Sequence, residues 1–139
     1  MENLDFVIER KILHIGNHLI AVRNKDLKGF GLTSSQSETL LFIERNEGAS
    51  IVSLKNYLDV SHQAVQKTVG KLRECGLVTL TVSAKDARVK NVSLTKDGKN
   101  LCEKLKRAGA LSGSTILEPL TKSEREKLLS LLAKIDVGQ

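Results

Sequence analysis

The sequence predicts a mainly α fold with a small β-hairpin, an α+β arrangement in which helices predominate. Apolar residues recur at helical spacing over most of the chain, whereas strict alternation is confined to two short runs, residues 77–82 and 89–94. A polar tip at residues 83–88 joins these runs, as in a hairpin. The 139 residues are 40% hydrophobic and 27% charged, which is the balance of a globular domain large enough for its own core.

The chain begins with a predicted helix over residues 4–27, whose apolar side chains cover much of its circumference. A terminal helix with so wide an apolar surface needs more than one neighbour, and a second subunit is the simplest supplier. Thr33 and Gln36 have the spacing of a capping box, so a second helix opens here and ends near Gly48.

A short helix over residues 51–58 and a longer helix after Ser61 follow, with a tight turn between them. The residues expected to be buried in these two helices are Leu54, Tyr57, Leu58, Ala64, Val65, Thr68, Val69 and Leu72. Ser61 is placed to cap the longer helix, and Gly76 ends it because glycine adopts the left-handed conformation without strain. This pair predicts a helix-turn-helix, and the hairpin after it makes the motif winged.

The outward face of the longer helix carries hydrogen-bond donors without a carboxylate among them, namely His62, Gln63, Gln66, Lys67 and Lys71. The hairpin adds the charged residues Lys85, Asp86, Arg88 and Lys90. A helix of donors followed by a basic hairpin is typical of a protein that grips double-stranded DNA. We therefore expect these residues, together with Ser61, to form a DNA-binding site.

The distribution of charge agrees with this site. The chain has a net charge of +6, and residues 61–96 hold seven basic residues against two acidic ones. Such an excess suits the neutralisation of phosphates, although a solvated basic face would have the same composition. Aromatic residues make up 3% of the chain and tryptophan is absent, which argues against a platform that stacks single-stranded bases.

A fifth helix is predicted after Thr95, and Pro119 closes the segment that contains it. The residues that lower helix propensity in its second half are Gly109, Ser112, Gly113 and Ser114, so we expect a bend or a looser turn there. Thr121 and Glu124 form a second capping box and open a last helix. Its apolar stripe consists of Leu128, Leu129, Leu131, Leu132 and Ile135.

In this order and spacing, the elements resemble the MarR family of bacterial transcriptional regulators over nearly the whole chain. The matching motifs are Leu32-Thr33-x-x-Gln36, Val60-Ser61-x-x-Ala64-Val65, Leu72-x-x-x-Gly76-Leu77-Val78, Asp86-x-Arg88 and Leu94-Thr95-x-x-Gly98. The resemblance implies a winged helix-turn-helix with N- and C-terminal dimerisation helices. Residues 1–139 would form a single domain, with a DNA-binding lobe at 32–98 and a helical dimerisation lobe made of 1–30 plus 100–139.

The resemblance also implies a homodimer that binds a pseudopalindromic operator, usually as a repressor that a small-molecule effector such as an aromatic acid relieves. By position, the helix after Ser61 is the family's recognition helix, Arg88 is its wing arginine, and Asp86 is the acid that orients this arginine. Two positions depart from the pattern, and so does the glycine-serine run near residue 112, which falls in what is usually continuous helix. Asp59 replaces a common glycine, and Gly70 replaces a better helix former at a cost of up to about 1 kcal/mol.

The sequence leaves three alternative functions open. A winged-helix module that binds protein without DNA readout would not need Lys85, Arg88 and Lys90 around one tip. A metal-responsive regulator would use His14 and His18, which are spaced i, i+4, but no nearby cysteine or carboxylate completes a site. We therefore expect no metal and no cofactor, and interpret both histidines as partly buried or interfacial.

A redox-responsive regulator would use Cys75 or Cys102, and a sensor thiol needs exposure and an electropositive setting. We expect both cysteines to be small buried residues instead. Two cysteines make no disulfide framework, so the cytoplasm is the expected compartment. No catalytic constellation is recognisable, and no apolar run is long enough for a secretory signal or a membrane span, so neither an enzyme nor a membrane protein is expected.

Overall fold

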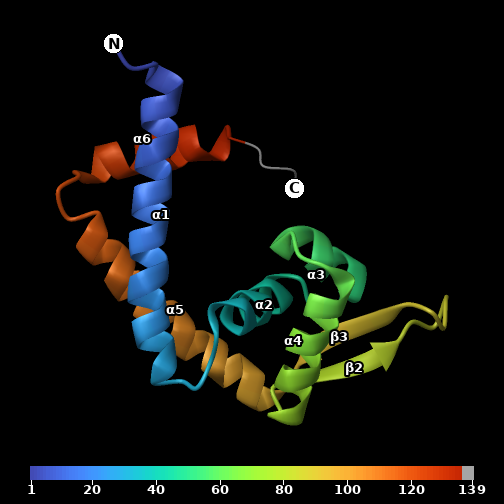
Figure 1. Cartoon of the computed structure of the whole chain (residues 1–139). Coiled ribbons are helices and arrows are strands. Elements are labelled where there is room, and N and C mark those ends of the chain that lie inside the picture. Colours follow the sequence, from blue (N-terminus) through green and yellow to red (C-terminus); the bar gives the residue numbers. More distant parts are fainter. Residues whose placement is uncertain (136–139) are drawn as a thin grey trace. The chain divides into compact units, whose positions relative to one another are not determined.

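The computed structural model describes residues 1–135, and its elements follow the predicted order (Figure 1). These elements are α1 Leu4–Lys28, α2 Ser34–Arg45, β1 Ala49–Ser50, α3 Ile51–Leu58, α4 His62–Glu74, β2 Val78–Val82, β3 Lys90–Leu94, α5 Lys96–Ile116 and α6 Lys122–Ala133. The chain divides into two compact units, Met1–Ser34 and Ser35–Gln139. The mainly α fold with a small antiparallel sheet is confirmed.

The first unit is built on α1, which confirms the single long helix. Asn3 caps it, since the side-chain oxygen Oδ1 accepts a hydrogen bond from the backbone N–H of Phe6 at 3.1 Å. Leu27 is its buried residue. The large apolar side chains that α1 exposes are Leu4, Phe6, Ile8, Ile12, Leu13, Ile15, Leu19 and Ile20. So wide an exposed apolar surface marks α1 as an interaction element.

The second unit has its core where α2, α3 and α4 meet the sheet. The most deeply buried apolar residues are Leu40 and Ile43 of α2, Leu54 of α3, Val65, Val69 and Leu72 of α4, and Val92 of β3. Helix α3 has the predicted bounds, and Asp59 ends it in the left-handed conformation with φ 53°, as expected for an aspartate in place of glycine.

Four of the residues expected to be buried in this helix pair are not, and one of them is Leu58, which is half-buried at the end of α3. Tyr57 is 36% exposed and lies against Phe42, with ring centroids 4.4 Å apart, because this ring packs on the surface of α2 instead of in the core. Ala64 is exposed and Thr68 is half-buried. Ala64 lies in the first turn of α4 and Thr68 lies one turn further along, where its hydroxyl donates to the carbonyl of Ala64 at 3.0 Å.

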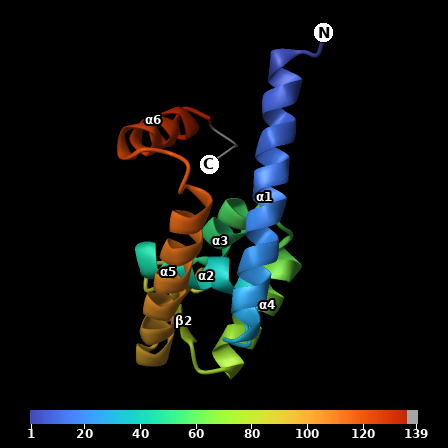
Figure 2. The ribbon, with the colours of Figure 1, turned by 90° about the vertical axis from the view of Figure 1, so that its left-hand side faces the viewer.

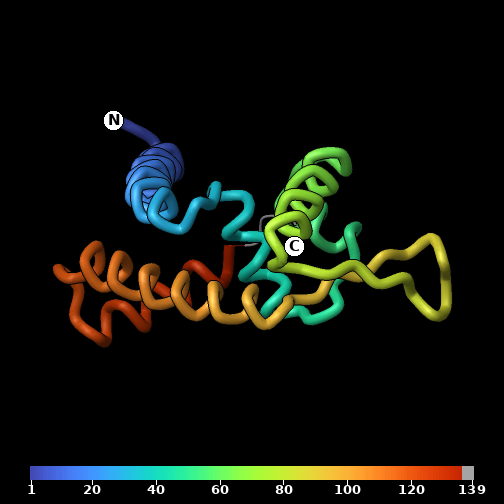
Figure 3. The backbone as a smooth tube through the Cα atoms, turned by 90° about the horizontal axis from the view of Figure 1, so that it is seen from below, coloured from blue at the N-terminus to red at the C-terminus, as the bar shows by residue number. Residues whose placement is uncertain are grey.

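The sheet has three antiparallel strands in the order β1-β3-β2. In the hairpin, Val78 pairs with Leu94 and Leu80 pairs with Val92, and the buried positions of β3 are the predicted ones. The sequence did not predict β1, where Ala49 pairs with Val92. Val82, expected to be half-buried, is 59% exposed because the hairpin extends beyond the helices of its unit (Figure 3).

A close contact joins the hairpin to α5. Thr95 caps α5 by accepting from the N–H of Gly98 at 3.1 Å, and its hydroxyl donates to the carbonyl of Gly76 at 2.7 Å. Gly98 is buried against the backbone of Leu77, where a Cβ atom would overlap the Leu77 carbonyl oxygen. A glycine is therefore required at the point where the helix crosses the start of the hairpin.

Helix α5 packs on α2 through its first half. The thiol of Cys102 donates to the carbonyl of Leu40 at 3.6 Å, and Lys106 lies 3.0 Å from a carboxylate oxygen of Glu44. The expected looser turn is wrong, because α5 continues as one helix through Gly109 and Gly113 to Ile116. Local propensity is overridden here by the continuous helical hydrogen bonding on both sides.

Helix α6 opens with the predicted capping box, in which Thr121 and Glu124 exchange side-chain and backbone hydrogen bonds. It contributes no buried residue to the described part of the chain. Within residues 1–135, no helix is both long enough and apolar enough to cross a membrane. The grouping of residues 1–30 with 100–139 as one dimerisation lobe stays a prediction, and residues 136–139 of that range lie outside the described residues.

Candidate nucleic-acid interface

The orientation of α4 is set at its start and along its buried face. The hydroxyl of Ser61 accepts from the N–H of Ala64 at 3.1 Å and caps the helix. Val65, Val69 and Leu72 are at most 2% exposed, so the opposite face is turned to solvent. The predicted site residues on that exposed face are His62, Gln63, Gln66, Lys67 and Lys71.

One carboxylate reaches this face. Glu74 lies 4.0 Å from the ammonium of Lys71 at the end of α4, and both side chains are more than half exposed. An exposed pair at this spacing contributes little to stability and is screened by salt. Near the start of α4, the hydrogen-bond donors of the exposed face have no acidic residue of the same helix turn beside them.

Hydrogen bonds within residues 83–89 order the tip of the wing. The N–H of Ser83 donates to the carbonyl of Val89 at 2.8 Å, and the N–H of Val89 donates to the carbonyl of Asp86 at 3.0 Å. The N–H of Lys85 donates to the hydroxyl of Ser83 at 3.2 Å. These contacts order a loop that has no core of its own.

Arg88 and Asp86 form a two-pronged pair at this tip. Nε of Arg88 donates to Oδ1 of Asp86 and Nη2 donates to Oδ2, each at 3.1 Å, while the N–H of Arg88 also bonds Oδ1 at 3.0 Å. The side-chain hydrogen bonds from Arg88 hold the pKa of Asp86 below its ordinary value. The side chain of Arg88 is 91% exposed, so Asp86 orients it without covering it.

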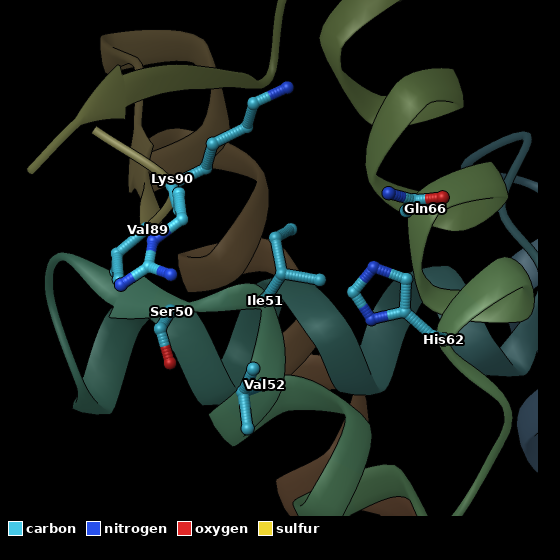
Figure 4. Close-up of a pocket in the computed structure, with 8 residues that line it drawn as sticks. Ser50, Ile51, Val52, His62, Gln66, Val89 and Lys90 are labelled. Atoms are coloured by element: carbon cyan, nitrogen blue, oxygen red, sulfur yellow. The ribbon is translucent and has the colours of Figure 1, made fainter. Parts of the chain in front are cut away.

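A hollow of about 300 Å³ lies between α4 and the wing (Figure 4). It is lined by Ser50, Ile51, Val52, His62, Gln66, Arg88, Val89 and Lys90. In the close-up, the imidazole of His62 points from α4 toward Ile51. The structure thus brings together four predicted site residues that are up to 28 positions apart in the sequence.

The other predicted site residues lie outside the hollow, namely Ser61, Gln63, Lys67, Lys71, Lys85 and Asp86. Sequence reasoning missed Ser50, Ile51, Val52 and Val89, of which the last three supply an apolar wall. No sequence pattern marks them, because the pairing of β1 with β3 is what brings the start of α3 to the base of the wing. With two cations and no carboxylate among its lining residues, the hollow favours an anionic partner.

The cysteines and histidines differ from one another in burial. Cys102 is buried, and burial raises the pKa of its thiol to about 11. Cys75 is exposed at the end of α4, so its predicted burial is wrong. His14 and His18 are exposed on α1. The described residues include no group of three or more histidine, cysteine or acidic side chains that could hold a metal ion.

Comparison with known proteins gives a consistent assignment. A family model described as MarR family matches residues 30–89. The uncharacterized HTH-type transcriptional regulator YybA of Bacillus subtilis is 26% identical over 128 residues, which is 92% of this chain and 85% of that protein.

The solved structures agree. A MarR protein from Peptoclostridium difficile superposes with a TM-score of 0.85 at 24% identity, covering 96% of this chain and 88% of that one. A mutant of E. coli MarR complexed with operator DNA superposes with a TM-score of 0.80 at 26% identity, covering 96% and 98%. In the matched family model and in its fold, the chain is thus similar to the MarR family of winged helix-turn-helix transcriptional regulators.

Proposed function

We propose that this regulator acts as a cytoplasmic homodimer that binds a pseudopalindromic DNA operator, with α4 in the major groove and the wing along the backbone and minor groove. The observation that carries the proposal is the hollow in which donors from α4, His62 and Gln66, meet cations from the wing, Arg88 and Lys90. A surface that combines base-reading and phosphate-binding groups suits duplex DNA. The DNA-bound E. coli relative supports the same partner.

Base reading is assigned to the start of α4. Gln63, Gln66 and Lys67 are exposed on its outward face, and residues near the start of a recognition helix reach base edges in the major groove. A glutamine amide pairs with the N6 and N7 positions of adenine through two hydrogen bonds. Gln66 is therefore the proposed reader of one base pair in each half-site.

Backbone contacts are assigned to the wing. Lys85 and Lys90 flank the tip and are exposed, so their ammonium groups are free to meet phosphates. Arg88 has a second role, because a narrow A·T-rich minor groove has a strong negative potential that attracts guanidinium groups. Asp86 orients this arginine through the two side-chain bonds described above.

Dimerisation is assigned to the apolar surfaces of α1 and α6, which a single chain leaves exposed. A two-fold dimer would present two α4 helices to half-sites about one helical turn, ~34 Å, apart. Repression that a small-molecule effector such as an aromatic acid relieves is the proposed regulation, carried over from the family. By linkage, such an effector would weaken DNA binding as much as DNA weakens effector binding.

The test is a titration of wild type and variants with two labelled duplexes, one from upstream of the chain's own gene and one of random sequence, over a salt series. Gln66→Ala is expected to lose about 1–3 kcal/mol on the operator and almost nothing on random DNA. Lys90→Ala should weaken both duplexes and flatten the salt dependence by roughly one unit of slope. Arg88→Ala should lose most on operators with A·T-rich flanks.

Lys104→Ala is the matched control, because it removes one exposed lysine of α5 outside the proposed interface. Its affinity for both duplexes should equal that of wild type. If Gln66→Ala weakens both duplexes equally and Arg88→Ala changes neither, the assignment of helix and wing is wrong. Light scattering that finds a monomer with full DNA affinity at micromolar concentration would exclude the dimer.

A further inference from the structure

Helix α6 is held to the rest of its unit by few interactions. It contributes no buried residue, and Leu129, Leu131 and Leu132 are 47–69% exposed. Figure 2 shows α6 leaving the end of α5 through a short turn. The direction of its leucine face therefore depends on how firmly residues 117–121 are fixed.

One side chain fixes this turn. Nη2 of Arg125 donates to the carbonyl oxygen of Leu117 at 2.8 Å, and Nε donates to the same oxygen and to that of Leu120, each at 3.2 Å. Leu117 is the C-terminal cap of α5, where carbonyl groups have no partner inside the helix. A guanidinium at this end also opposes the negative pole of the helix dipole.

The contact spans the joint between the two helices. Arg125 lies in the first turn of α6, and its half-buried side chain reaches back across the turn to Leu117, the C-terminal cap of α5. Among the described residues of α6, it is the one whose side-chain hydrogen bonds extend beyond the helix and its N-cap. Arg125 thus adds side-chain hydrogen bonds across the joint to the backbone bonds of the turn itself.

We propose that Arg125 is a positioning residue for homodimerisation, which fixes the turn so that the leucine face of α6 is oriented before the partner arrives. The inference rests on the proposed dimer. A preoriented helix loses less conformational freedom on association, so the dimer is tighter than one formed with a free α6. The planar fork of arginine suits two carbonyl acceptors, whereas the ammonium of lysine is a point charge on a flexible stem.

The test compares wild type, Arg125→Ala, Arg125→Lys and the control Lys127→Ala by sedimentation velocity over a concentration series. Lys127 is an exposed cation of the same helix, so the control removes the same charge. We expect the dimer dissociation constant to rise roughly tenfold in Arg125→Ala, as for the loss of hydrogen bonds to a charged group. Arg125→Lys should fall between that variant and wild type, and Lys127→Ala should match wild type.

Hydrogen exchange supplies a second readout. The N–H of Leu120 donates to the carbonyl of Leu117 at 2.9 Å, and its exchange should accelerate in Arg125→Ala at concentrations where the chain is monomeric. A dimeric wild type with an unchanged dissociation constant in Arg125→Ala would overturn this inference and leave the proposed function intact. A monomeric wild type would overturn both the inference and the proposed dimer. If Lys127→Ala raises the dimer dissociation constant as much as Arg125→Ala does, the effect comes from net charge and the inference is wrong.

Discussion

Replacing Gly98 by alanine tests the contact that joins the hairpin to α5. The added Cβ would overlap the carbonyl oxygen of Leu77 and lie 3.2 Å from both the carbonyl carbon of Leu77 and Cδ2 of Leu94. The leucine side chain can rotate away, but the Leu77 carbonyl is backbone and also accepts the N–H of Thr95 at 3.0 Å. The start of α5 must therefore move away from the hairpin, which lengthens this bond.

The magnitude follows from two opposing effects. Overpacking of this kind costs about 1–3 kcal/mol, and a rigid backbone neighbour places Gly98→Ala toward the upper end of that range. Replacing a glycine within a helix by alanine stabilises the folded state by about 0.5–1 kcal/mol, which offsets part of this cost. We expect a net loss of about 2 kcal/mol in the free energy of unfolding. For a chain of this length, that corresponds to a fall of about 6 °C in the melting temperature.

Gly70→Ala is the matched control, because the same chemical change occurs in a helix where no described atom lies within 4 Å of the new Cβ. It should stabilise the chain by about 0.5–1 kcal/mol. Both variants are measured by urea unfolding at one fixed protein concentration without DNA, since dimerisation and ligands shift apparent stability. If Gly98→Ala is as stable as wild type while Gly70→Ala gains, the close approach to Leu77 does not exist.

Three further predictions concern single groups. Thr95→Val removes both the cap of α5 and the bond to the Gly76 carbonyl, so it should cost about 1–2 kcal/mol in urea unfolding, while Thr95→Ser, which keeps both, should cost less. A thiol reagent at pH 8 should label Cys75 quickly and Cys102 only on unfolding, because the latter is buried with a pKa of about 11; rapid labelling of both would contradict this. The Asp86–Arg88 pair should stabilise the wing fully at any pH above the ordinary pKa of an aspartate. This stabilisation should be lost as the pH falls through the lowered pKa of Asp86. The pKa of Asp86, followed by NMR titration, should therefore be higher in Arg88→Ala than in wild type.

Local signals were sufficient for most elements of the fold. The caps at Ser61, Thr95 and Thr121 are sequence patterns that act over three or four residues, and each forms in the structure. The bounds of α3 followed from its apolar spacing and the turn at Asp59. Such features depend on near neighbours in the chain, so the sequence alone contains the information that specifies them.

Features that depend on distant partners were missed or wrong. Strand β1 is two residues long, which is too short for any alternation, and it exists because β3 is available to pair with it. The exposure of Cys75 and the surface stacking of Tyr57 on Phe42 are likewise tertiary results. For α5, the glycine and serine residues predicted weakness that the surrounding helix overrides.

In the candidate site, too, the residue types could be predicted from the sequence but their assembly could not. The residue types and spacing of Gln66, Arg88 and Lys90 marked them as groups for an anionic duplex. Their assembly into one hollow with Ile51 and Val52 depends on where the wing base meets α3. Alternation patterns cannot supply that meeting point, because it joins segments about 40 residues apart along the chain.

The short strand β1 has a consequence for the changes in length that the wing can accept during evolution. Through it, the base of the wing is paired to residues that lead directly into α3, while the tip at 83–89 is closed by its own Ser83–Val89 bond. Insertions between Ala84 and Ala87 therefore lengthen a solvent-exposed loop and leave the sheet register unchanged. The tip that is proposed to contact DNA can therefore vary in length without disturbing α4. A two-residue insertion there should leave the unfolding temperature within a few degrees of wild type, and a collapse of the fold would refute this separation.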